Sequence, residues 1–320
     1  AASGHIAPGR AGGSGEAMDS DLHTLDVFTG RRFGGNPLAV ILAADKLDAE
    51  AMQQIAREFN LSEAVFVLKA DNPAHSARVR IFTPAKELPF AGHPTVGAAA
   101  LLASLKFPDI KDEQDAIVVL EQTIGTVRVG VRLRPGQPAF AEFDAPRLPK
   151  EAGALPPVEK RAAGLGLIAS EVGFENHRPA CFAAGNAFAF VPVASMEALN
   201  KARINNPHWA DAFEEQGLVG AYLYTRQCIH TGSAFHARVF APGAGVPEDP
   251  ATGSAAVSFA GVVQLFDDLP DGMHKRLIEQ GYAMDRPSQI MLTLTVEGGK
   301  LSGVRIGGHA VRVASGRLTL

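Results

Sequence analysis

The chain reads GHPTVGAAALLASL from residue 92 to residue 105, and this stretch decides the fold. Pro94 suits the first position of a helix, where its missing N–H costs no hydrogen bond. From Thr95 to Leu105 the predicted helix is apolar on nearly every side. Because a helix that is apolar all round must be surrounded by protein, we expect a sheet to enclose it.

A second stretch has the same character. Residues 252–266 read TGSAAVSFAGVVQLF, which is apolar on every face apart from Ser254, Ser258 and Gln264. Strand-rich segments follow the two stretches at residues 117–143 and 289–320 and would supply the enclosing sheets. We therefore predict the same unit, a sheet curled around an apolar helix, at two places in the chain.

Three pairs of short segments recur in the same order and indicate an internal repeat. A Gly-Asn turn before an apolar strand occurs at 35–36 and 185–186, RIFTP at 80–84 recurs as RVFAP at 238–242, and GHPTVGAA at 92–99 aligns with EDPATGSA at 248–255. The offsets are 150, 158 and 156 residues. The last alignment pairs His93 with Asp249, so the repeat predicts different polar residues at equivalent positions.

The predicted fold class is α+β, with two pseudo-symmetric domains that each wrap a barrel-like sheet around a central apolar helix. The first repeat domain is expected at residues 21–135 and the second at 136–320, with the last strands free to pack back on the first domain. A helix over 48–59, capped by Asp48, and strands over 64–68 and 77–82 belong to the first domain. Residues 1–20 are predicted to be a disordered tail or an expression remnant, with Met18 as a candidate native start.

Composition narrows the class of protein. A chain of 320 residues suits two domains, and its 46% hydrophobic and 20% charged residues exclude a disordered chain. A net charge of −4 gives no basic footprint for nucleic acid. No apolar run approaches the roughly 18 residues of a membrane span. Only two cysteines, Cys181 and Cys228, are present, which favours a reducing, cytoplasmic location over a disulfide framework.

The repeat also predicts where a ligand binds. The N-terminus of each apolar helix offers unpaired N–H groups and positive potential, which attract a carboxylate or an enolate oxygen. Gly92 and Gly253 allow the backbone to approach a ligand closely. His93 titrates near neutrality and could carry a proton, Asp249 could orient an amine or hydroxyl, and Ser254 could donate a hydrogen bond. The simpler alternative is that His-Pro and Asp-Pro only form turns and helix caps.

Glu63 is the third candidate for catalysis. It stands between a predicted helix and an apolar strand, beside Leu61, Val65 and Phe66. A buried carboxyl there would have a raised pKa, which suits a general acid/base, although most such residues are solvated. The expected substrate-binding residues are Asn36, Ser62, Gly92, Thr252, Gly253 and Ser254. For Asn36 and its partner Asn186 a simple turn-forming role is an equal alternative.

Several motifs together make the chain similar to the PhzF family of phenazine biosynthesis. They are DVF at 26–28, FGGNP at 33–37, NLSE at 60–63, PFAGHPT at 89–95, RVFAP at 238–242 and EDPATGSA at 248–255. The resemblance extends from about residue 24 to the end of the chain. It implies the fold of diaminopimelate epimerase, with two pseudo-symmetric halves around central helices, and it implies a homodimer.

The resemblance also implies an activity. PhzF enzymes isomerise a dihydro-hydroxyanthranilate without a cofactor, as a glutamate moves a proton between two ring carbons and the enol then becomes a ketone. The glutamate of that family falls on Glu63, its histidine on His93, its aspartate on Asp249, and its Gly-Ser on Gly253 and Ser254. The prediction is therefore an isomerase that needs no cofactor or metal and acts on a small carboxylate substrate. The resemblance does not carry the identity of that substrate.

Other readings fit the sequence less well. A two-thiol racemase would need a cysteine at each helix mouth, where this chain has His93 and Asp249. His230 and His236 would stand about 20 Å apart on one strand, too far to share a zinc ion. Motifs for phosphate loops, dinucleotide binding and serine hydrolysis are absent from the sequence. The alternative that stays open is a catalytically silent, small-molecule or protein-binding member of the same fold.

Overall fold

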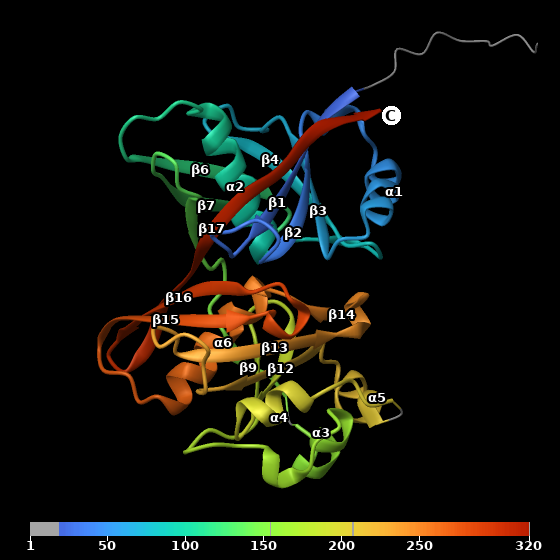
Figure 1. Cartoon of the computed structure of the whole chain (residues 1–320), viewed down its shortest axis with the longest axis vertical. Helices are drawn as coiled ribbons and strands as arrows, with labels where there is room; N and C mark the ends of the chain where they lie inside the picture. Colours follow the sequence, from blue (N-terminus) through green and yellow to red (C-terminus); the bar gives the residue numbers. More distant parts are fainter. Residues whose placement is uncertain (1–18, 154, 207, 320) are drawn as a thin grey trace, which may run out of the picture.

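The computed structural model describes residues 19–153, 155–206 and 208–319. It has two lobes stacked along the long axis of the molecule (Figure 1). Most of the tail predicted over residues 1–20 lies outside the described residues, and Asp19 and Ser20 already belong to the first strand. No helix in the described ranges is both long and apolar enough to cross a membrane.

The first half holds strands in a curved sheet and two α-helices. Its elements are β1 (Asp19–Val27), β2 (Asn36–Ile41), α1 (Ala49–Phe59), β3 (Glu63–Leu68), β4 (Ala77–Phe82), β5 (Glu87–Leu88), α2 (Gly92–Lys106), β6 (Gln114–Gln122), β7 (Gly125–Leu133) and β8 (Ala139–Asp144). The helix predicted over 48–59 is confirmed, and the Asp48 side chain caps it by accepting from the Ala51 N–H at 2.8 Å. β4 has the predicted bounds, and β3 begins one residue early.

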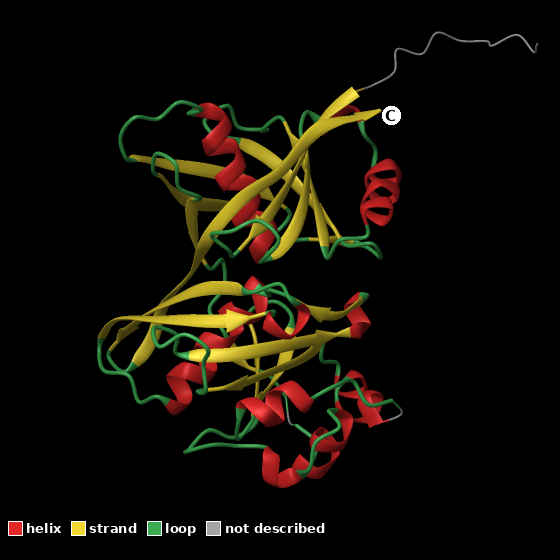
Figure 2. Cartoon of the chain, viewed as in Figure 1, coloured by secondary structure: helices red, strands yellow, loops and turns green. Residues whose placement is uncertain are grey.

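The second half follows the same plan with extra helices at its far end (Figure 2). Its elements are β9 (Lys150–Glu151), α3 (Val158–Gly164), β10 (Ala180–Ala183), β11 (Ala187–Pro192), α4 (Met196–Lys201), α5 (His208–Ala212), β12 (Gly220–Thr225), β13 (Phe235–Ala241), β14 (Val246–Asp249), α6 (Gly253–Phe266), β15 (Gly272–Gln280), β16 (Ser288–Glu297) and β17 (Lys300–Thr319). α3, α4 and α5 cover an apolar cluster around Trp209 and Phe213.

The order of strand pairing in the first half recurs in the second. In the first half the pairs are β1–β2, β2–β3, β3–β4, β4–β5, β4–β6, β6–β7 and β7–β8. The pairs β2–β3 and β4–β6 are parallel, and the others are antiparallel. β10 to β17 pair in the same sequence and directions. The described part of the chain is thus a mixed fold of helices and barrel-like sheet.

Helices α2 and α6 are buried along most of their lengths. α2 contacts β1, β2, β3, β6, β7, β8 and β17, whereas α6 contacts β9, β10, β11, β16 and β17. Small residues allow this packing, because a Cβ on Gly97 would lie 2.5 Å from a Leu38 methyl and one on Gly261 would lie 2.4 Å from the Phe182 ring. The apolar helices predicted from the sequence therefore form. α2 starts at Gly92, two residues before Pro94.

The helix starts correct the register of the repeat. Gly92 and Gly253 each begin a helix, so the offset at this point is 161 residues rather than 156. His93 therefore corresponds to Ser254, and Asp249 corresponds to Leu88. The alignment was misled because Pro94 and Gly97, which lie inside α2, matched Pro250 and Gly253, which lie before and at the start of α6.

β17 joins the two halves. It pairs with β16 over Lys300–Gly307, with β8 over Arg305–Ala310 and with β1 over Ala310–Thr319. In Figure 1 this strand runs from the lower half to the top of the upper one, where it ends beside the start of β1. The first half therefore takes one of its strands from the end of the chain.

The packing around Gly97 gives a stability prediction. Gly97→Ala should gain helix propensity but force its methyl against Leu38 and Val27, with a net loss of about 1–3 kcal/mol in the free energy of unfolding. Gly130→Ala is the control, because the nearest atom to its new methyl is 3.9 Å away, and it should change stability by less than about 0.5 kcal/mol. Urea unfolding followed by circular dichroism measures both, and equal effects would contradict the packing of α2.

Candidate functional site

Two helix N-termini meet at the junction of the halves. A Cβ atom on Gly92 would lie 2.8 Å from the Cα of Gly253, and one on Gly253 would lie 3.1 Å from the Cα of Gly92. Only glycine permits so close an approach of two backbones. Since the first N–H groups of a helix have no partner within it, this junction has the positive potential that suits an anion.

Asp249 links the two halves at this junction. Its side chain accepts hydrogen bonds from Asn36 Nδ2 at 2.8 Å and Ser62 Oγ at 3.0 Å, both from the first half. Thr252 Oγ1, just before α6, donates to its other oxygen at 2.6 Å. Burial raises the pKa of the Asp249 carboxyl, and the three donors oppose part of that rise. Residues from both halves thus fix the position of this carboxyl group.

Glu63 and His93 lie together on the first-half side of the junction. Glu63 opens β3, and its Oε2 is 3.3 Å from Nδ1 of His93, the second residue of α2. Their side chains are 16% and 4% exposed. Burial raises the pKa of Glu63 well above its ordinary value of 4.5, and the nearby Asp249 carboxylate raises it further. A carboxyl in this position can take up and release protons nearer to neutral pH.

The expectation that His93 titrates near neutrality is wrong. Burial lowers the pKa of His93 from 6.5 to about 3, so its imidazole is neutral at physiological pH. Its Nε2 is buried and has no hydrogen-bond partner in the described part of the chain, and the same holds for Oδ1 of Asn36. Buried polar atoms normally have partners, so these two are groups that a polar ligand could satisfy.

All nine residues predicted for the site lie at or beside the junction. Ser254, the second residue of α6, is partly exposed there, in the place that His93 takes in α2. By contrast, Asn186 is an exposed turn residue between β10 and β11. The equal alternative of a turn former therefore describes Asn186, whereas Asn36 is fully buried against Asp249.

Gln280 is a contributor that the sequence did not reveal. Its Nε2 donates to the main-chain oxygen of Asp249 at 2.7 Å and to Thr252 Oγ1 at 3.0 Å, and its Oε1 accepts from the Thr252 N–H at 3.1 Å. Its side chain is fully buried at the end of β15. A single glutamine at a strand end carries no motif, so only the fold shows that it supports the loop before α6.

Each half also has an arginine–glutamate pair close to the site. In the first half Arg80 Nε and Nη2 donate to the two Glu87 oxygens at 2.7 Å each. In the second half Arg238 makes the same bidentate contact with Glu248 at 2.8 and 2.9 Å. Each glutamate stands five residues before the glycine that starts the helix. Both pairs therefore fix the strand that leads into a helix N-terminus, and Glu248 adjoins Asp249.

A hollow of about 370 Å³ opens next to this junction. Ser62 lines it together with Pro37 and Pro250, the neighbours of Asn36 and Asp249. Its size is within the range for small-molecule pockets. Glu63, His93 and Asp249 do not line it, so the hollow lies beside the candidate catalytic groups and not around them.

The sequence profile of a family described as phenazine biosynthesis-like protein matches residues 25–316. The chain belongs to this family. It is 50% identical over 296 residues to an uncharacterized isomerase of Mesorhizobium japonicum, covering 92% of this chain and 96% of the relative. It is 33% identical over 296 residues to the trans-2,3-dihydro-3-hydroxyanthranilate isomerase of Pseudomonas aeruginosa, covering 92% of this chain and 98% of that enzyme.

A solved structure of this family agrees with the fold. A predicted epimerase from Pseudomonas aeruginosa is 34% identical, with a TM-score of 0.75 and coverage of 94% of this chain and 99% of that one. The resemblance to the PhzF family stated from the motifs is thus confirmed. Its relatives carry the names of isomerases and an epimerase, so the expected enzyme class, an isomerase, is supported too.

The arginine–glutamate pairs of this phenazine biosynthesis-like protein give a matched stability test. Arg238 is 9% exposed and Arg80 27% exposed. Glu248→Gln leaves a buried guanidinium without its carboxylate and should cost on the order of 3 kcal/mol of unfolding free energy. Glu87→Gln weakens a more exposed pair and should cost less than about 1 kcal/mol. Chemical unfolding of both variants checks this, and a larger loss for Glu87→Gln would contradict the assignment.

The raised pKa of Glu63 predicts how stability depends on pH. In the folded protein this carboxyl holds its proton above pH 4.5, where an unfolded glutamate releases it, so the folded state binds more protons in that window. The contribution of Glu63 to stability is therefore favourable at acid pH and is lost as pH rises through the raised pKa.

Glu63→Gln removes this loss. We expect the variant to be more stable than the unsubstituted protein at pH 8 by about 1–2 kcal/mol, and to lose that advantage near pH 4. Glu58→Gln, an exposed change on α1, is the control and should give no such pH-dependent difference. Urea midpoints across this pH range measure it. An equal difference at both pH values would show that Glu63 titrates as it does in the unfolded chain.

Proposed function

We propose that this protein is a cofactor-independent isomerase that moves a proton between two carbons of a small amino carboxylate, with Glu63 as the acid/base. One observation carries the proposal: a Glu63 carboxyl of raised pKa lies beside His93 and near Asp249, where two helix N-termini meet. Abstraction of a proton from carbon needs a base shielded from water and donors that stabilise the resulting enolate. In this proposal Glu63 supplies the base and the two helix N-termini supply the donors.

Glu63 serves as base first and acid second. Its ionised form takes a proton from a substrate carbon, and the electron pair of the broken C–H bond moves into an enolate or extended enolate. The protonated Glu63 then gives a proton to another carbon, and because its side chain is 16% exposed, that proton can first exchange with solvent. A raised pKa suits both steps, because a carboxyl with a pKa near the working pH is a good acid and a good base.

His93 has a positioning role in this proposal. The neutral imidazole lies 3.3 Å from Glu63 through Nδ1, and when that nitrogen bears the proton it can donate toward the carboxylate. Its unpartnered Nε2 then presents a lone pair to a donor group of the substrate. A substrate amine or hydroxyl is the kind of donor that meets this need.

The helix N-termini at Gly92 and Gly253 are proposed to hold the substrate carboxylate and the enolate oxygen, with the Ser254 hydroxyl as a further donor. Asp249 is engaged by Asn36, Ser62 and Thr252, so it orders the mouth of α6 and supplies negative charge near a substrate amine. Placing these donors before the reaction avoids the cost of rearranging solvent during it.

We further infer that the two halves are copies of one domain and that each wraps its sheet around a central helix. The recurring pairing order and the two buried helices support this. In this proposal the site forms only where both copies meet, so neither half is active alone. Homodimerisation and a cytoplasmic location remain predictions from the sequence.

Deuterium exchange tests the proposed chemistry. The protein is incubated in D2O with trans-2,3-dihydro-3-hydroxyanthranilate and with a panel of small 2-amino carboxylates. We expect it to catalyse the incorporation of deuterium at carbon, which NMR measures. Glu63→Gln should lower this rate at least ~100-fold, Glu63→Asp should retain part of it, and Glu58→Gln should leave it unchanged. The rate should rise with pH through the raised pKa of Glu63, because the base must be ionised.

Lack of exchange with every compound, while thermal shifts show that one of them binds, would favour the silent binding member over the isomerase. Deuterium incorporation at an unchanged rate in Glu63→Gln would show that Glu63 is not the acid/base. Both outcomes are read with the same samples, and circular dichroism confirms that each variant is folded.

A further inference from the structure

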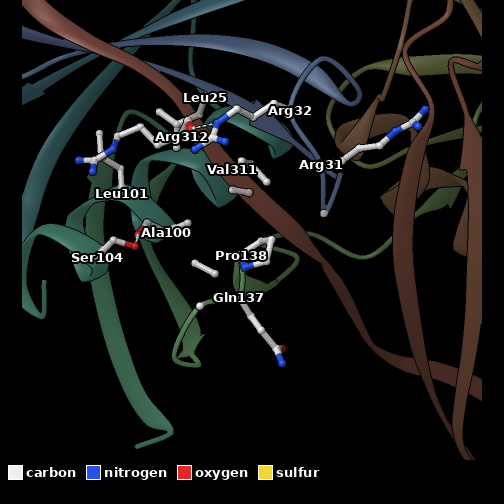
Figure 3. A pocket seen from close by; sticks show the side chains of 14 residues that line it. Leu25, Arg31, Arg32, Ala100, Leu101, Ser104, Gln137, Pro138, Val311 and Arg312 are labelled. Atoms are coloured by element: carbon white, nitrogen blue, oxygen red, sulfur yellow. Dashed lines mark hydrogen bonds between the residues drawn. The ribbon is translucent and has the colours of Figure 1, made fainter. Parts of the chain in front are cut away.

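A separate hollow of about 520 Å³ lies in the first half of the molecule. Figure 3 shows it between the C-terminal part of α2, strand β17 and the turns at residues 30–32 and 136–138. Its α2 residues, Ala100, Leu101 and Ser104, stand eight to twelve positions after Gly92. At a rise of about 1.5 Å per residue they are roughly 12–18 Å along the helix from the candidate active site.

Two arginines give this hollow its charge. Arg32 and Arg312 both line it, and in Figure 3 the Arg32 guanidinium lies at the main chain of Arg312, whereas the side chain of Arg31 points away. Arg32 Nε donates to the main-chain oxygen of Arg312 at 3.1 Å, which orients the guanidinium and leaves its terminal nitrogens available. No Asp or Glu lines the hollow, and within the described ranges neither guanidinium is in ion-pair distance of a carboxylate. The positive charges of Arg32 and Arg312 are therefore available to a negatively charged ligand.

The floor of the hollow is apolar. It consists of buried side chains that are at most 7% exposed: Leu25, Ala100, Leu101, Ala139 and Ala310. The volume is within the range of pockets that hold small molecules. An apolar floor beside a pair of cations fits a ligand that has both an apolar body and a negative group.

We propose that this hollow, the arginine pocket, binds a small organic anion whose carboxylate pairs with Arg32 and Arg312 and whose apolar body covers the floor. Guanidinium groups match a carboxylate with two parallel hydrogen bonds. Arg32 and Arg312 are both exposed, so the apolar floor contributes by covering the body of the ligand and not by shielding the ion pair. The two arginines come from the connection between β1 and β2 and from β17, so the pocket exists only when β17 has paired with β1. This site shares no residue with the proposed catalytic one.

Titration calorimetry with benzoate tests the proposal, since benzoate has a carboxylate on a flat apolar body. We expect saturable binding to the full chain. Arg32→Gln and Arg312→Gln should each raise the Kd roughly tenfold or more, as expected for loss of a charged hydrogen-bond partner. Arg128→Gln, an exposed arginine of β7 outside the pocket, is the matched control and should change the Kd less than about twofold. Glu63→Gln should leave the Kd unchanged.

Two further probes separate charge from shape. Benzamide has the same body without the charge, and inorganic phosphate has the charge without the body, so both should bind at least about tenfold more weakly than benzoate. Absence of saturable benzoate binding, or a benzoate Kd unaffected by both pocket variants, would overturn the proposal. Equal binding of benzamide would exclude the role of the arginines, and equal binding of phosphate would exclude the apolar floor. Thermal melting shows that the variants are folded.

Discussion

The close contact between Gly92 and Gly253 is the constraint on which the rest of the structure depends. If either helix began with a residue other than glycine, the two backbones could not lie so near, because the Cβ atom of that residue would overlap the backbone of the other helix. This contact makes two sets of unpaired N–H groups point to one place, and it brings Glu63 of one half near Asp249 of the other. The buried helices, the sheets around them and the paired arginine–glutamate contacts all serve to hold the two glycines in position.

This arrangement has a cost in stability that, in the proposed function, is also the source of the chemistry. Two carboxyl groups lie within each other's field in a place with little water, so the folded protein favours a protonated Glu63. Asp249 is better supported, because Asn36, Ser62 and Thr252 donate to it. In the proposed function the unequal support assigns different tasks: Asp249 is fixed by hydrogen bonds, and Glu63 exchanges its proton. The pairing of a stabilised and a destabilised acid is a common feature of sites that move protons.

Much of the fold and of the candidate site could be predicted from the sequence, because periodicity and short motifs indicate them. The two apolar helices and the strands from 64 to 68 and 77 to 82 follow from periodicity, and the motif set around Glu63 pointed to the family. The register of the repeat was wrong because a proline and a glycine inside α2 matched a proline before α6 and the glycine that starts it. The pKa of His93 could not be read from the chain, since it depends on burial by residues far away in sequence. Gln280 was missed for the same reason, as its partners lie about 30 positions earlier.

The long strand β17 has a consequence for how the protein is made. β1 pairs with residues 310–319, which are synthesised almost 300 residues after it. During translation the first half therefore carries an open strand edge at β1, with unpaired backbone groups that other chains can bind. An incomplete chain is expected to need protection by chaperones at this edge, even after its own helices α1 and α2 have formed. Nascent chains halted before residue 310 should be more prone to aggregation than the full chain, although most of the first half is already present in them.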